Sequence, residues 1–137
     1  MAKDTIMTPN RNPFSSDRVV GATITATPES SNARTVSIPL MSPRKKQISG
    51  KVSVFTVYLS DAATGIGLCA AAPSGGVIAG ANGQILNPPV AGKMFVCQSD
   101  ATGLMTLTVT EATIKTFYVC VVLPDSTLVA PFALAYA

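Results

Sequence analysis

Few side chains in this 137-residue chain are of the types that carry out catalysis. The chain contains no histidine, which removes the usual general base and the commonest zinc ligand. Its cysteines are Cys69, Cys97 and Cys120, so no thiol has a histidine to activate it, and no CxxC pair is present to bind zinc. The odd number favours reduced, buried thiols over a disulfide framework.

The acidic side chains also lack the grouping that chemistry requires. Asp61, Asp100 and Asp125 lie in turn-forming sequences, where aspartate is favoured because its carboxylate accepts hydrogen bonds from nearby backbone amides. Glu111 is the remaining acid of residues 52–137, and no loop brings two acids together as a calcium site requires. We therefore expect no catalytic residue, no metal and no cofactor, and we expect that the protein is not an enzyme.

Alternation of apolar and polar residues with a period of two predicts β-strands. The pattern is clearest at residues 104–110 and 116–123, on either side of a corner at 111–115 that we interpret as one helical turn. Residues 52–59 are apolar on both faces, which favours a central strand. Further strands are predicted at residues 19–27, 34–41, 66–71, 76–78, 84–86, 93–98 and 127–137.

This series of short strands predicts an all-β sandwich or barrel, because each apolar strand face needs a second sheet to cover it. Pro39 and Pro131 interrupt two of the strands. Proline cannot donate to the hydrogen-bond ladder, so these strands are expected to lie at a sheet edge or to meet a bulge.

Charged residues make up only 12% of the chain, against 47% hydrophobic residues, and the mean hydropathy is +0.40. Such a composition favours a surface that is partly covered in an assembly. The alternative is a surface made polar by Thr, Ser and Gly. The longest apolar stretch, residues 128–137, is about half the ~20 residues that a membrane span needs, and we expect neither a membrane segment nor a signal peptide.

Positive charge is concentrated in the first 51 residues, which hold eight Lys and Arg against three acids, whereas residues 52–137 hold two against four. Residues 1–33 are interpreted as an extended N-terminal arm and residues 34–137 as the β-domain. Such an asymmetry is typical of a basic arm that docks on an acidic partner. The candidate partner-binding residues, from the arm and a basic turn at 42–46, are Arg11, Phe14, Arg18, Arg44, Lys45 and Lys46. We expect no nucleic-acid binding, because no aromatic residues are interleaved with these cations.

Several short motifs carry a resemblance to a known family. They include YLSDAATG at residues 58–65, APSGGV at 72–77, VAGK at 90–93 and SDATG at 99–103. Over residues 34–137 the chain resembles small proteins encoded in tailed-bacteriophage structural-gene clusters, and its final two strands are similar to the closing hairpin of bacterial immunoglobulin-like domains. Residues 1–33 lie outside the match. The basic turn at 42–46 departs from the family pattern, which has an acidic, glycine-bearing turn there.

The resemblance implies an immunoglobulin-like antiparallel β-sandwich with an extended N-terminal arm. It also implies a virion structural protein assembled in the bacterial cytoplasm. The reading that fits best is a homotrimeric capsid decoration, or cement, protein that binds the major capsid protein or other virion proteins through its arm and sandwich and stabilises the head shell.

Two alternatives remain open at the level of the sequence. One is a structural protein of the neck, head–tail junction or tail. The other is an exposed immunoglobulin-like module that grips the host surface through an aromatic patch, for which Tyr58, Tyr118 and Tyr136 are the candidates. Tyr118 also suits a structural role, with its hydroxyl bonded back to the chain as in a tyrosine corner.

Overall fold

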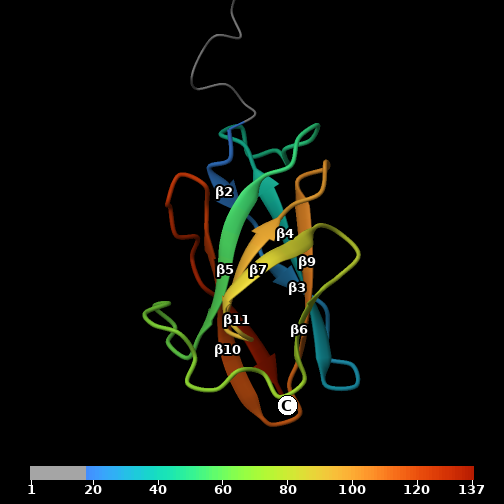
Figure 1. The fold of residues 1–137 in the computed structure, drawn as a ribbon, viewed down its shortest axis with the longest axis vertical. Coiled ribbons are helices and arrows are strands. Elements are labelled where there is room, and N and C mark those ends of the chain that lie inside the picture. The colour runs from blue at the N-terminus through green and yellow to red at the C-terminus, as the bar shows by residue number, and fades with distance from the viewer. Residues whose placement is uncertain (1–17) are drawn as a thin grey trace, which may run out of the picture.

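A computed structural model describes residues 18–137, which form two antiparallel β-sheets packed face to face (Figure 1). This part of the chain contains no helix, and therefore none with the length and apolarity that crossing a membrane requires. The strands are β2 (Gly21–Ala22), β3 (Thr25–Ala26), β4 (Ala33–Met41), β5 (Val54–Ser60), β6 (Gly76–Ala79), β7 (Gln84–Val90), β8 (Met94–Gln98), β9 (Leu104–Thr110), β10 (Lys115–Val122) and β11 (Phe132–Tyr136).

The five-stranded sheet has the order β11-β10-β5-β8-β7, and the other sheet has the order β2-β4-β9-β6, with β3 also paired to β4. The pairs β4–β9–β6 and β5–β10–β11 reproduce the B–E–D and C–F–G pairings of an immunoglobulin-like sandwich. The chain departs from that fold in the middle, where β6 joins one sheet before the β7–β8 hairpin extends the other. The predicted all-β sandwich is confirmed.

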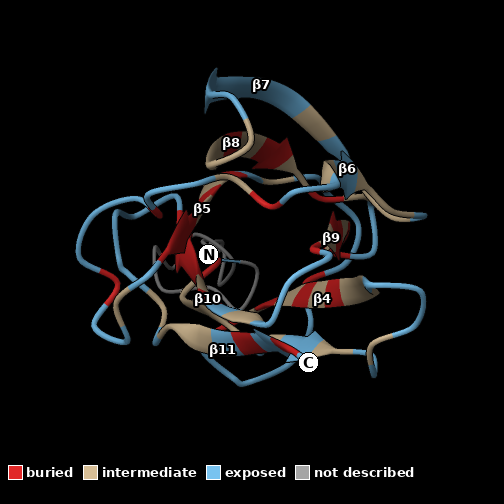
Figure 2. Ribbon diagram, turned by 90° about the horizontal axis from the view of Figure 1, so that it is seen from below, coloured by how far each residue is buried: buried red, intermediate tan, exposed pale blue. Residues whose placement is uncertain are grey.

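The core lies between the two sheets, as the view along the strands in Figure 2 shows. Strand β5 is central in its sheet, as predicted, and turns Phe55, Val57 and Leu59 inward, each at most 3% exposed. Strand β10 beside it buries Phe117, the largest fully buried side chain. Because side chains alternate along a strand, this inward set fixes which residues face outward.

The edge position predicted for the strand that contains Pro39 is wrong. This strand, β4, lies inside its sheet, with β9 on one side and β2 and β3 on the other. The Leu40 amide donates to the Gly103 carbonyl oxygen on the β9 side, so the Pro39 nitrogen faces the other way. There the neighbouring strand is broken at residues 23–24, between β2 and β3. The missing donor therefore meets an interruption in the ladder, which is how an inner strand accommodates proline.

Residues 66–71 form a loop, and the strand predicted there is wrong. The loop is fixed by side chains of strand β5 and its end. The Tyr58 hydroxyl donates to the Gly65 carbonyl oxygen at 2.6 Å, and the Asp61 carboxylate accepts a hydrogen bond from the Ala70 amide at 2.9 Å. In a strand these backbone groups would have paired with a neighbouring strand, but here side chains satisfy them. The alternation of apolar and polar residues at 66–71 therefore did not decide the conformation of this segment.

The helical turn predicted at residues 111–115 is also absent, and the chain bends there between β9 and β10. Glu111 is 4% exposed and holds the bend together. Its two carboxylate oxygens accept hydrogen bonds from the Ser74 and Thr113 amides, each at 3.0 Å. The hydrogen bond from the Thr113 hydroxyl is the chief reason that the pKa of Glu111 lies below its usual value, and the two amide bonds lower the pKa further.

Candidate partner-binding site

The basic turn at residues 42–46 is held rigidly by its own backbone and by one buried hydroxyl. The Ser42 amide donates to the Lys46 carbonyl oxygen, and the Lys45 amide donates to the Ser42 carbonyl oxygen, at 2.8 and 2.9 Å. Ser42 is 5% exposed, and its side-chain oxygen accepts from the Arg44 amide. Arg44, Lys45 and Lys46 are all exposed. The three cations therefore lie on a turn that is already ordered before any partner binds.

The chain enters the sandwich directly beside this turn. Val19 is buried, the Val20 amide donates to the Met41 carbonyl oxygen at 3.0 Å, and β2 then pairs with the end of β4. Arg18 is thereby placed at the end of the sandwich that carries the basic turn, at the top of Figure 1. The predicted partner-binding residues Arg11 and Phe14 lie outside the described residues.

A groove of about 350 Å³ opens between this entry point and the basic turn. Its walls are mostly apolar, with a cation at the rim. The lining residues are Val20, Gly21, Ala22, Thr23, Met41, Ser42, Pro43 and Lys45. An apolar groove bordered by fixed positive charge suits an extended acidic segment with an apolar side chain to insert.

The same end of the sandwich holds Lys51 as well, so within residues 18–137 five cations stand there against two carboxylates. Both carboxylates are already engaged in their own turns. Asp100 accepts hydrogen bonds from the Thr102 side chain, the Asn82 side chain and the Leu104 amide, and these lower its pKa to about 2. The pKa of Asp125 is lowered mainly by the amide of Thr127, with a smaller contribution from nearby Arg18.

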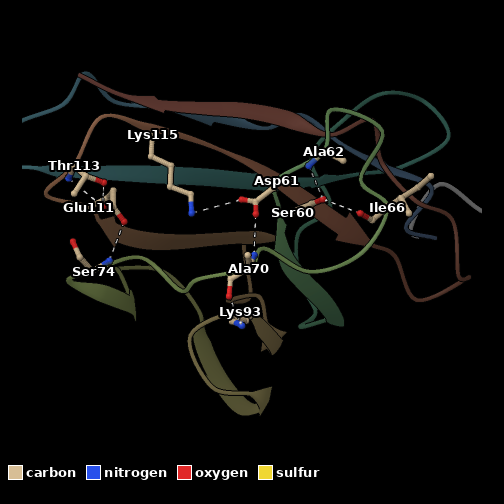
Figure 3. Close-up of polar contacts among 10 residues, drawn as sticks. All are labelled: Ser60, Asp61, Ala62, Ile66, Ala70, Ser74, Lys93, Glu111, Thr113 and Lys115. Atoms are coloured by element: carbon tan, nitrogen blue, oxygen red, sulfur yellow. Dashed lines mark hydrogen bonds and ion pairs between the residues drawn. The ribbon is translucent and has the colours of Figure 1, made fainter.

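Charges at the opposite end of the molecule are balanced and are used internally, as Figure 3 shows. Lys115 pairs with Asp61 at 3.7 Å, and the Lys93 ammonium donates to the Ala70 carbonyl oxygen at 3.1 Å. The Arg34 guanidinium likewise donates to the carbonyl oxygens of Thr27 and Ala135. Among residues 18–137, the exposed cations are therefore concentrated at the basic end, which we define as Arg18, Arg44, Lys45, Lys46 and Lys51.

The candidate chemical groups are buried in the core or engaged in structural contacts. The three thiols are buried, as predicted; burial raises the pKa values of Cys69 and Cys120, and that of Cys97 to about 12. No group of three or more Cys, Asp or Glu side chains within residues 18–137 is arranged to hold a metal.

Two of the three tyrosines proposed for a binding patch are engaged inside the molecule. The Tyr136 hydroxyl donates to the Val109 carbonyl oxygen at 2.6 Å, and Tyr58 bonds to Gly65. Tyr118 is half-buried on the outer face of β10. A back-bonded hydroxyl of the kind expected for Tyr118 is thus supplied by Tyr136, from the last strand of the chain.

No family model and no curated protein matches this chain. The evidence for the partner-binding site therefore comes from the geometry of this structure. The sequence identified the basic turn and Arg18 separately. It missed the groove, because the groove forms only where β2 pairs with the end of β4.

Proposed function

We propose that this protein is a structural component of a tailed-bacteriophage virion and, more specifically, a decoration protein that binds and stabilises the head shell. The observation that carries the proposal is the basic end, where exposed cations and an apolar groove surround the point at which the N-terminal segment enters the sandwich. The phage assignment itself comes from the sequence resemblance over residues 34–137.

The electrostatics of the basic end favour an acidic partner surface. Its cations are exposed, and the turn that carries three of them is already ordered by backbone bonds. Little conformational entropy is then lost on binding, and complementary charge raises the rate of encounter. The opposite end offers no such excess, so the proposed orientation has the basic end facing the shell.

Two linked contacts explain how a small domain stays bound to a particle. A chain of 17 residues, the length that precedes Arg18, spans up to roughly 55 Å when extended, and the described chain begins beside the groove, which Val20–Thr23 line. If the sandwich and this segment each bind the shell, the second contact forms at high effective concentration. Affinity then exceeds that of either contact alone.

Particle binding by a deletion variant tests the proposal. Phage particles that lack the protein are incubated with the full chain or with a chain that lacks residues 1–17, and bound protein is measured after sedimentation. We expect the deletion variant to fold and to lose binding to the particles. Equal occupancy by both proteins would refute the linked-contact mechanism, and no binding by the full chain would refute the decoration role.

The second candidate function, a structural protein of the neck or tail, would bind its partner through the same basic end. Electron microscopy of particles carrying the bound, gold-labelled protein distinguishes these positions. Label distributed over the shell supports decoration, and label confined to the neck or tail supports the second candidate.

A further inference from the structure

Gly21 occupies a strand position at which the fold does not require a glycine. All ten glycines of the chain lie within residues 18–137. Seven of them have a φ between 75° and 87°, where glycine is favoured, and at Gly75 and Gly80 an added Cβ would collide with a threonine side chain. Gly21 has neither property, because its φ lies outside the left-handed region and an added Cβ meets no atom of residues 18–137 within 4 Å.

The missing side chain at Gly21 leaves space on the outer face of the sheet. Gly21 on β2 pairs in register with Met41 on β4, so the two residues share a face. That face is the outer one, because side chains alternate along a strand and the adjacent Leu40 is fully buried. Gly21 and Met41 both line the groove of about 350 Å³. Glycine inside a strand weakens it and is typical of a place where a ligand approaches the backbone closely.

The groove beside Gly21 has ordered walls and positive charge along one side. One wall is held by the 3.0 Å bond from the Val20 amide to the Met41 carbonyl oxygen, and the other belongs to the hydrogen-bonded turn at residues 42–46. Lys45 lines the groove, with the exposed Arg44 and Lys46 on either side of it in the turn. The volume lies near the lower limit of the ~300–1,000 Å³ typical of ligand pockets, so the groove suits a few side chains of a partner.

We propose that the groove binds an extended acidic peptide segment, which inserts one large apolar side chain into the space beside Gly21. Burying that side chain against the apolar walls removes apolar surface of both partners from water. The three cations of the turn favour carboxylates in the ligand on charge complementarity. A segment in extended conformation fits best, because the absence of a Cβ at Gly21 lets a second backbone lie close to the strand.

This inference rests on the proposed function only in taking the shell as the source of the segment. It narrows the contact at the basic end from a charged surface to a peptide with an apolar anchor. A charged surface without such an anchor would be held by the exposed cations and would not enter the groove. A side chain that fills the groove therefore distinguishes the two modes of binding.

Gly21→Leu fills the groove from within, and Thr25→Leu is the matched control. Thr25 is exposed on the same outer face, four residues further along the chain and outside the groove. Binding is measured by NMR titration with two nine-residue acidic peptides that differ only in their central residue, leucine or alanine. The wild type and Thr25→Leu should bind the leucine peptide about tenfold more tightly than the alanine peptide. Gly21→Leu should lose this preference.

Thermal melting tests whether the glycine serves the fold itself. Gly21→Leu should melt at or above the wild-type temperature, because glycine weakens a strand that does not need it. Gly21→Ala, with a smaller side chain, should lower the preference for the leucine peptide only in part. A large loss of stability in both variants would overturn the proposal. So would a wild type without preference for the leucine peptide, or a folded Gly21→Leu chain that keeps it.

Two further measurements separate this inference from its alternatives. If deletion of residues 1–17 raises the affinity for the leucine peptide about tenfold, the chain's own N-terminal segment occupies the groove and the proposal is wrong. Sedimentation with phage particles tests the shell as the source of the segment. Equal particle binding by wild type and Gly21→Leu would keep the decoration role and overturn the groove as its contact. Peptide preference without any particle binding would support the groove and refute the decoration role.

Discussion

The Tyr136 hydroxyl donates a 2.6 Å hydrogen bond to the Val109 carbonyl oxygen and so joins the edge strand of one sheet to an inner strand of the other. Tyr136 is 3% exposed, and its ring packs edge-on against Phe117 at a centroid distance of 6.4 Å. The Arg34 bond to Ala135 and the bond from the Ala137 amide to the Glu29 carboxylate close the same side of the sandwich. Edge strand β11 is thus held by contacts between the sheets as well as by β10.

Removing the Tyr136 hydroxyl should therefore destabilise the fold. Tyr136→Phe leaves the Val109 carbonyl oxygen buried without this donor, and we expect a loss of about 1–2 kcal/mol in the free energy of unfolding. Urea denaturation measures it. Tyr118→Phe, on the outer face of β10, is the control and should change stability by less than about 0.5 kcal/mol. Equal effects at both positions would contradict the structural role assigned to the Tyr136 bond.

The same hydroxyl gives a prediction for alkaline pH. Burial raises the pKa of Tyr136 to about 12 from its usual value of 10.0. The unfolded chain therefore loses this proton first, so the contribution to stability is complete below pH 10 and is lost as the pH rises towards 12. The difference in unfolding free energy between wild type and Tyr136→Phe should therefore shrink as the pH rises over that interval. A difference that stays constant across it would argue against a buried, protonated hydroxyl.

Two glycines with left-handed backbone conformations should differ in how much stability is lost when each is replaced by alanine. Gly103 and Gly50 have φ values of 80° and 87°, but a Cβ at Gly103 would collide with the Ile48 carbonyl oxygen, whereas one at Gly50 meets nothing within 4 Å. We expect Gly50→Ala to cost about 1 kcal/mol and Gly103→Ala about 3 kcal/mol or more, because the second adds a steric clash. Melting temperatures of the two variants measure the difference, and similar values would contradict the close approach.

Charge at the basic end should govern attachment to phage particles. Lys46→Gln removes an exposed cation beside the groove, and Lys93→Gln removes one at the opposite end, with the same change in net charge. We expect Lys46→Gln to weaken particle binding about two- to fivefold and to reduce its salt dependence. Lys93→Gln should bind as the wild type does. The reverse ranking would place the contact at the other end of the sandwich.

The inward and outward faces of most strands were predictable from local sequence. The alternation around Phe117 and Met105 identified β10 and β9, and the doubly apolar pattern around Val57 identified a central strand. These predictions succeed because alternation with a period of two is a property of the strand itself and needs no knowledge of its neighbours. The same signal accounts for the burial of Cys97, but Cys69 lies in a loop and Cys120 belongs to the outward set of β10, so contacts outside the strand pattern bury these two.

Which segments become neighbours was decided only by the tertiary structure. Pro39 lies in an inner strand because the adjacent strand happens to break opposite it, and residues 66–71 are a loop because Asp61 and Tyr58 bind their backbone. Arg18 and Arg44 are far apart in the sequence and meet at one end because β2 pairs with the end of β4. Strand pairing between distant segments depends on the whole set of available partners, and no local pattern contains that information.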